Sequence, residues 1–290
     1  MRPPGQRRRW VALLLAWLFV IELIAASAVP VMRNSSERAA QLVAPVHRQA
    51  NVVATPLVVR DRVVRLIGGP ATDRLLARIA SNIGTAIDQV EAFWGVDWPH
   101  DISVVAADSD EQFRIAAGGG PASQWADIAA VTVFDYADPA HRAAVGQRIV
   151  FAPGAVNISE PALRIVLAHE LFHYAARVDT ALDAPHWLTE GVADFVARPP
   201  TSVPADARSG YLSLPSDIEL DAPGPQRSLA YDRAWWFARF VADIYGSPKL
   251  RAYYLAACGV GHADPLTAAH EVLGIDSADL LDQWKQWMMR

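Results

Sequence analysis

The chain has 290 residues, of which 52% are hydrophobic and 20% are charged. This composition is typical of a globular protein and excludes disordered, collagen-like and coiled-coil classes. The formal net charge of −5 gives no electrostatic reason to expect a nucleic acid or an anionic membrane surface as a partner. Cys258 is the single cysteine, which excludes an intrachain disulfide, a cysteine zinc ribbon and an iron–sulfur cluster. Any bound metal must therefore use histidine and carboxylate ligands.

Residues 1–31 have the pattern of a segment that directs the chain out of the cytoplasm. Three arginines at positions 7–9 precede an almost wholly apolar run, and small residues follow it, which is the order found in a signal peptide. An uncleaved membrane anchor is the alternative, because residues 10–29 just suffice to span a bilayer if Glu22 is tolerated near one end. In both cases we expect the body outside the cytoplasm, either secreted or held at the membrane by this segment. Residues 32–60 are expected to form a stalk or lead-in.

The first part of the body alternates strands with helices. Short β-branched runs bounded by turn residues predict strands, and apolar side chains at helical spacing predict helices. The predicted elements are strands at residues 62–67, 102–106, 129–134 and 148–151, and helices at residues 71–94 and around Phe113. The helix around Phe113 has a plausible cap at residues 108–110.

Helices dominate the second part. Ser159 is a good N-cap for a helix at residues 162–178, and a second helix is expected at residues 187–197. A segment rich in Pro, Ser, Gly and Asp predicts a long loop at residues 199–227, after which residues 230–290 have a helical pattern throughout. We therefore expect an α+β fold with a mixed sheet and helices at residues 61–198, followed by a loop and a helical subdomain at residues 199–290.

The predicted helix at 162–178 contains the motif His169-Glu170-Leu171-Phe172-His173. Four residues advance an α-helix by about 400° and 6 Å, so both imidazoles lie on one face and can reach one ion. Glu170 lies about 100° from that row, where it can touch a water bound to the ion. Chance produces such a motif only about 0.007 times in a chain of this composition. A helix with two unrelated histidines is the alternative.

Glu190 follows the motif on a second predicted helix, within Trp187-Leu188-Thr189-Glu190-Gly191-Val192-Ala193-Asp194. Two histidines and one glutamate leave zinc (Zn2+) a fourth position for water. Asp194 stands one helical turn after Glu190, where it can accept a hydrogen bond from a ligand imidazole. A solvent-exposed helix charge is the alternative for Glu190.

The motif and the segment W-L-x-E-G-x-A resemble the gluzincin metallopeptidases, the group of thermolysin and aminopeptidase N, and most closely their compact peptidase MA-like members. The resemblance spans roughly residues 60–260 and implies a thermolysin-like zincin fold. It implies that His169, His173 and Glu190 bind zinc, that Glu170 is the general base and that Asp194 supports a ligand histidine. The segment that starts Tyr231-Asp232-Arg233-Ala234 is similar to the Y-E-K-G segment of the aminopeptidases, which makes Tyr231 the candidate donor to the oxyanion. A tyrosine packed at a helix start is the alternative.

Two departures limit what the resemblance implies. The G-x-M-E-N element by which aminopeptidases grip a substrate N-terminus is absent, so aminopeptidase activity is not implied. A separate N-terminal β-sandwich domain is also not expected in the short stretch before residue 61.

The sequence thus predicts a zinc-dependent metallopeptidase that hydrolyses peptide or protein substrates outside the cytoplasm, with Glu170 as general base on a zinc-bound water. Two alternatives remain: a non-catalytic, membrane-tethered binding protein on a peptidase fold, and a zinc amidohydrolase of non-protein amides. Residues 148–151, just before the active-site helix, are expected to be the edge strand on which an extended substrate adds. His186 is expected to be a loop histidine, with a role in the cleft as the alternative.

Overall fold

The computed structural model describes residues 52–53, 56–122, 125, 128–204, 213–222 and 224–290. The predicted signal peptide or anchor at residues 1–31 and most of the predicted stalk lie outside the described residues. Within the described residues, no helix combines the length and the apolar character that a membrane crossing needs.

The larger sheet of the described residues has six strands and mixed direction. It consists of β1 (Val52–Val53), β2 (Leu57–Val59), β3 (Arg62–Gly68), β4 (Asp101–Ala106), β5 (Ala130–Val133) and β8 (Arg148–Phe151). Along the sheet the order is β1, β3, β4, β8 and β5, and β2 also pairs with β3. Strands β3, β4 and β8 run parallel, whereas β5 is antiparallel to β8. All four strands predicted from the sequence are confirmed.

The prediction that residues 148–151 form an edge strand is wrong. Strand β8 lies inside the sheet between β4 and β5, and β5 is the outermost strand on that side. Ile149, Val150 and Phe151 are completely buried, as is typical of an interior strand covered on both faces. The continuous apolar run at residues 149–151 already favoured this position.

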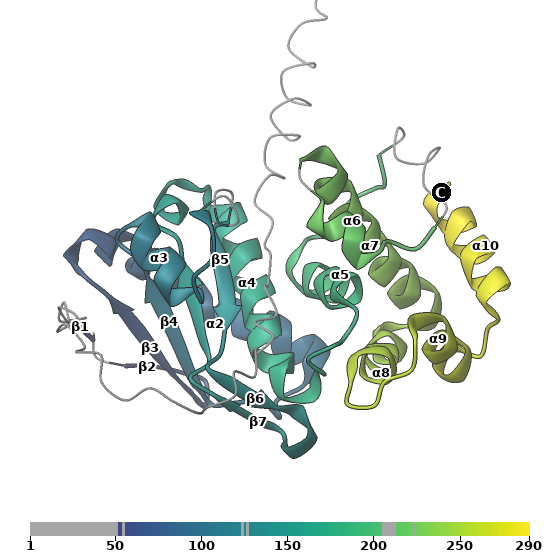
Figure 1. The fold of residues 1–290 in the computed structure, drawn as a ribbon, viewed down its shortest axis with the longest axis horizontal. Coiled ribbons are helices and arrows are strands. Elements are labelled where there is room, and N and C mark those ends of the chain that lie inside the picture. Colours follow the sequence, from purple (N-terminus) through teal and green to yellow (C-terminus); the bar gives the residue numbers. More distant parts are fainter. Residues whose placement is uncertain (1–51, 54–55, 123–124, 126–127, 205–212, 223) are drawn as a thin grey trace, which may run out of the picture.

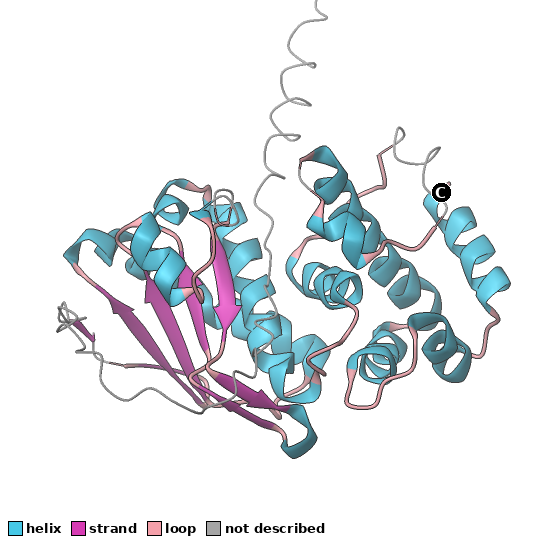
Figure 2. Cartoon of the chain, in the orientation of Figure 1, coloured by secondary structure: helices cyan, strands magenta, loops and turns pink. Residues whose placement is uncertain are grey.

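Helix α2 (Asp73–Trp94) and helix α4 (Glu160–Ala176) pack against each other beside the sheet (Figure 2). The apolar side chains that predicted α2 by their helical spacing lie in the core. Ile79, Ile83 and Ile87 are completely buried. Ser159 caps α4, because its hydroxyl accepts a hydrogen bond from the backbone N–H of Ala162. The short helix α3 (Asp110–Ala116) has Ser109 as its N-cap, within the predicted capping segment.

A small hairpin of β6 (Tyr136–Asp138) and β7 (Ala143–Val145) was not predicted. It follows β5 directly, and its strands are only three residues long. Runs this short carry too little alternation of polar and apolar side chains to be recognised.

The remaining helices gather on the other side of the molecule (Figure 1). They are α5 (His186–Ala197), α6 (Asp217–Asp221), α7 (Pro225–Tyr245), α8 (Ser247–Cys258), α9 (Pro265–Leu273) and α10 (Ser277–Met288). Helix α6 lies within the predicted loop and is closed by a capping box between Ser216 and Glu219. The helical stretch predicted at residues 230–290 is four helices, and the first of them begins at Pro225.

Helices α4 and α5 meet where the two sides of the molecule join, and α5 packs on α7 as well. Phe172 of α4 forms edge-to-face contacts with Trp94 of α2 and with Tyr254 of α8. Trp94 and Tyr254 also contact each other edge to face. This aromatic cluster holds α4 in place from both sides, and the chain is an α+β protein with a mixed sheet.

Candidate metal centre

Helix α4 carries His169 and His173 one turn apart, and their side chains converge. The two Nε2 atoms lie 3.1 Å apart. The neighbouring Phe172 belongs to the aromatic cluster and lies on a different side of the helix. One face of α4 therefore packs in the core, and another carries the two histidines.

Helix α5 brings Glu190 to the same point. Its Oε2 lies 3.2 Å from Nε2 of His169, and its Oε1 lies 3.2 Å from Nε2 of His173. One donor atom from each of these three residues lies within 4.8 Å of the other two, which places them to hold a single metal ion. The predicted ligand set is thus brought together by two helices that are separated by a loop in the sequence.

The start of α5 is fixed by a residue far along the chain. Pro185 precedes the helix and offers no side-chain cap. The carboxylate of Asp217, at the start of α6, instead accepts hydrogen bonds from the backbone N–H groups of His186 and Trp187. An acidic side chain is also favourable at this end of the helix dipole.

Burial and neighbouring charges shift the pKa values of Glu190 and His169 in opposite directions. Burial disfavours the charged form of Glu190, but the surrounding histidines reverse that effect and hold the pKa of its carboxyl well below the usual range. Burial also lowers the pKa of His169, yet the hydrogen bonds and charges of Asp194 and Glu190 raise it well above the usual value. A carboxylate is therefore kept ionised beside two imidazoles.

The donor set fits a metal ion. Oε1 of Glu190 is buried, and its neighbours Nε2 of His173 at 3.2 Å and Nε2 of His186 at 3.3 Å do not meet hydrogen-bond geometry. A cation held between the carboxylate and the imidazoles would give this oxygen a well-aligned partner. Two imidazole nitrogens and a carboxylate oxygen are the ligands that zinc takes in hydrolytic sites. The residues therefore fit zinc.

Asp194 stands behind His169, as predicted. Its Oδ1 lies 2.9 Å from Nδ1 of His169, so that nitrogen is the hydrogen-bond donor and Nε2 is turned toward the other ligands. The contacts on the far side of Asp194 were not predicted from the sequence. Arg198 forms an ion pair of 2.9 Å with Oδ2 of Asp194 and a second of 2.9 Å with Asp232 of α7. These contacts join α5 to α7 directly behind the site.

Glu170 lies beside the ligand set and is fully buried. The hydroxyl of Thr132, on strand β5, lies 2.8 Å from Oε2 of Glu170. Burial is the main cause that raises the pKa of the Glu170 carboxyl, against the opposing effect of His169 and His173. A carboxyl group with a raised pKa is suited to take up and return a proton near neutral pH.

Tyr231 and His186, two other residues selected from the sequence, lie on α7 and α5. Tyr231 lies on α7, is 1% exposed and directly precedes Asp232. Its role at an oxyanion stays a prediction. His186 is not in a loop, because it is the first residue of α5, and its Nε2 lies 3.3 Å from Oε1 of Glu190. Burial lowers its pKa, but the carboxylate of Glu190 outweighs that effect and raises it.

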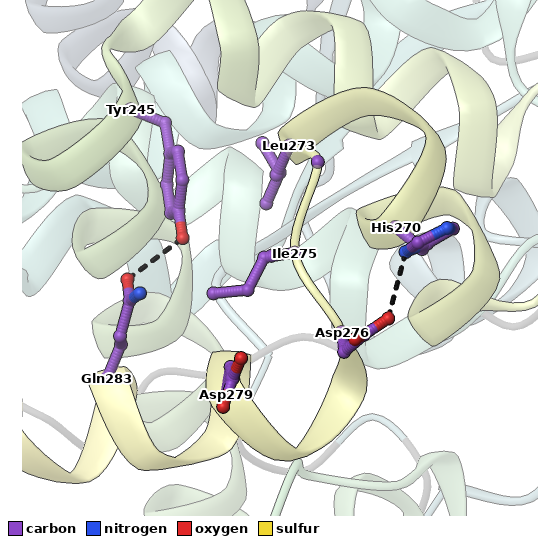
Figure 3. Close-up of a pocket in the computed structure, with 8 residues that line it drawn as sticks. Tyr245, His270, Leu273, Ile275, Asp276, Asp279 and Gln283 are labelled. Carbon is purple, nitrogen blue, oxygen red and sulfur yellow. Dashed lines mark hydrogen bonds and ion pairs between the residues drawn. The ribbon is translucent and has the colours of Figure 1, made fainter.

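A separate hollow lies among α7, α9 and α10, far along the chain from the motif (Figure 3). It holds about 320 Å³, and its lining includes Leu273, Ile275, Tyr245 and Gln283, the last two joined by a hydrogen bond of 2.9 Å. None of the predicted site residues lines it. The chemistry of the candidate centre therefore does not extend to this hollow.

No protein-family model matches the chain, and no curated protein matches it. Among solved structures, the chain is similar to a two-domain M1 zinc metallopeptidase mutant bound to L-arginine, with 14% sequence identity and a TM-score of 0.42. The match covers 81% of this chain and 50% of that one, so the chain spans half the length of this metallopeptidase. A similarity this low assigns neither a fold nor an activity.

Proposed function

We propose that this protein is a zinc-dependent metallopeptidase that hydrolyses peptide bonds outside the cytoplasm. The observation that carries the proposal is the convergence of His169, His173 and Glu190 next to a buried Glu170. In this proposal the three residues hold zinc, and the fold belongs to the thermolysin-like zincins. Zinc in such a site supplies Lewis acidity and lowers the pKa of a water molecule to about 7.

Glu170 is the proposed general base. Its carboxylate takes a proton from the attacking water and later gives it to the leaving amine, a task that its raised pKa favours. Asp194 holds Nδ1 of His169 and so fixes the orientation of that ligand. Tyr231 is the proposed donor to the oxyanion that forms on the attacked carbonyl.

Strand β5 is the proposed docking strand for the substrate. It is the outer strand of the sheet on the side of α4, and it contacts α4 directly. An extended peptide would add to its outer edge by backbone hydrogen bonds, which recognise a chain in extended form without regard to most side chains. This favours a peptide over a small amide as the substrate.

A zinc amidohydrolase of non-protein amides is the second candidate, because the same residues would perform the same chemistry. A non-catalytic binding protein is less well supported, since that role needs neither a buried base nor the Asp194 contact to His169. Secretion or membrane attachment through residues 1–31 is part of the proposal and rests on the sequence pattern alone.

The first experiment is to measure the zinc content of the purified full-length protein by elemental mass spectrometry. We expect about one zinc ion per chain, lost in the Glu190→Ala variant. Glu271→Ala is the matched control, because Glu271 is exposed on α9 and should leave the zinc content unchanged. A wild-type protein that takes up no zinc even when zinc is supplied contradicts the proposal.

If zinc is present, a library of internally quenched peptides and a set of small amides should be tested in parallel. Cleavage of peptides supports the peptidase assignment. Cleavage of small amides alone favours the amidohydrolase, and zinc binding with no turnover of either class favours a binding protein.

A further inference from the structure

Strand β5 and helix α4 are joined at the position of the proposed base. Oγ1 of Thr132 lies 2.8 Å from Oε2 of Glu170 and 2.8 Å from the backbone carbonyl oxygen of the same residue. Thr132 is half-buried, on a strand with no element beyond it among the described residues. A side chain of the outer strand thus contacts the reactive group of the active-site helix.

The hydroxyl of Thr132 carries one hydrogen and can donate it to one of these two acceptors at a time. A hydrogen bond to an ionised carboxylate is about twice as strong as one to a neutral carbonyl. When Glu170 is ionised, the hydroxyl therefore favours Oε2.

The two carboxylate oxygens of Glu170 are then not equivalent. Oε2 is held by Thr132, whereas Oε1 is buried and forms no hydrogen bond with a described residue. A buried oxygen in this condition is available for a new partner. Because a carboxylate is planar, holding one oxygen also fixes the direction of the other.

We propose that Thr132 is a positioning residue that holds Oε2 of Glu170 and leaves Oε1 as the oxygen that exchanges the proton. The inference rests on the proposed function, because only a hydrolase uses Glu170 as a base. It adds that the strand on which the substrate would lie also orients the base. In this proposal the same strand locates both the substrate and the base, and Thr132 is the third of its four residues.

The competing explanation is that Thr132 only ties β5 to the α4 backbone through the carbonyl of Glu170. Three variants separate the two roles. Thr132→Val removes the hydroxyl with little change of shape, and Thr132→Ser keeps it. Thr180→Val is the control, since the Thr180 hydroxyl also donates to an α4 carbonyl, that of Ala176, at 2.8 Å, and its other partner is the hydroxyl of Tyr254, not Glu170.

The first measurement needs neither zinc nor substrate. The metal-free protein is labelled with ¹³C at the glutamate side-chain carboxyl carbons, and the Glu170 signal is identified by its loss in Glu170→Gln. We expect Thr132→Val to shift this signal, and Thr132→Ser and Thr180→Val to leave it near the wild-type position. A Glu170 signal that is unchanged in Thr132→Val overturns the proposal.

The second measurement uses the zinc-loaded protein and a quenched peptide that the wild type cleaves. Thr132→Val should lower kcat by about 10–100-fold, because a base displaced by a fraction of an ångström reacts more slowly, with KM and zinc content unchanged. Thr132→Ser should restore most of the rate, and Thr180→Val should retain it. A wild-type kcat in Thr132→Val overturns the positioning role.

The two measurements also separate this inference from the proposed function. One outcome is that zinc-loaded wild type hydrolyses no substrate while the Glu170 signal still responds to Thr132→Val. This outcome contradicts the proposed peptidase function, and Thr132 then has no catalytic base to position. Hydrolysis by the wild type with no response of either readout to Thr132→Val leaves the peptidase standing and removes Thr132 from it.

Discussion

Gly191 of α5 approaches Ala234 of α7 so closely that no side chain fits between them. A β-carbon placed on Gly191 would lie 2.5 Å from the carbonyl oxygen of Ala234. Gly191 follows Glu190 directly, so the close approach of the two helices and the position of Glu190, the proposed third ligand, depend on the same turn of α5.

Gly191→Ala should therefore move α5 away from α7 and displace Glu190. The obstacle is backbone, which cannot rotate aside, so we expect destabilisation of about 1–3 kcal/mol. Thermal unfolding of the metal-free protein measures this effect, and zinc titration should show weaker binding. The exposed Gly154, where a β-carbon meets nothing within 4 Å, provides the matched control as Gly154→Ala. Equal stability of Gly191→Ala and wild type contradicts the steric argument.

Glu170→Gln should keep zinc and abolish turnover. Glutamine has nearly the same shape but cannot accept a proton at neutral pH, so the loss is expected to reach at least about 10²–10⁴-fold in kcat. Kinetics with a quenched peptide and zinc analysis of the same sample test both parts. Retained activity in a variant with a full zinc complement would remove Glu170 from the mechanism.

Asp194→Ala should weaken zinc binding by about 10–100-fold, because His169 loses the partner that fixes its Nδ1–H. Competition with a chromophoric chelator gives the affinity. Asp232→Ala is the informative comparison, since Asp232 shares Arg198 with Asp194 but does not touch a ligand. We expect a smaller loss there, and equal losses in both variants would assign the effect to Arg198 instead.

Tyr231→Phe should lower kcat by about 10²–10³-fold if the hydroxyl donates to the oxyanion. KM and zinc content should change little, because the ring that packs in the core is retained. A wild-type rate in this variant returns Tyr231 to a packing role.

Zinc affinity should fall as the pH falls. In the metal-free protein the pKa of His169 is raised well above 6.5, so this imidazole holds a proton that zinc must displace. Below that pKa, the dissociation constant should grow about tenfold per pH unit for each proton displaced. By the same linkage, the stability that the protonated His169 gains from its carboxylate partners is lost as the pH rises through the folded pKa. Chelator competition from about pH 6 to pH 8 tests the zinc effect, and a flat affinity profile contradicts it.

The convergence of His169, His173 and Glu190 was predictable because helical spacing alone places the two histidines on one face, and the next helix supplies a carboxylate. The long buried elements were predictable for a similar reason, since Ile79, Ile83 and Ile87 repeat at the period of a helix. Local sequence signals suffice when the interacting residues share one element or adjacent ones.

Contacts between distant elements escaped prediction. Nothing near Thr132 in the sequence indicates that its hydroxyl meets Glu170, and Arg198 gives no sign of its two carboxylate partners. The interior position of β8 was not predicted, because it depends on pairing with β5. Strand β5 precedes β8 in the sequence and lies antiparallel to it at the edge of the sheet. Gly191 did carry a signal, since a glycine inside a helix often marks a close approach of another element.

The cap supplied by Asp217 has a consequence for the order in which the chain folds. Helix α4 is capped by its own neighbour Ser159, a local contact, whereas the first turn of α5 is capped by a carboxylate that stands 31 residues after His186. Such a loop must close before its contact stabilises anything, which delays that contact relative to local ones. We therefore expect the α5 cap, and with it the fixed position of Glu190, to form after the α4 cap.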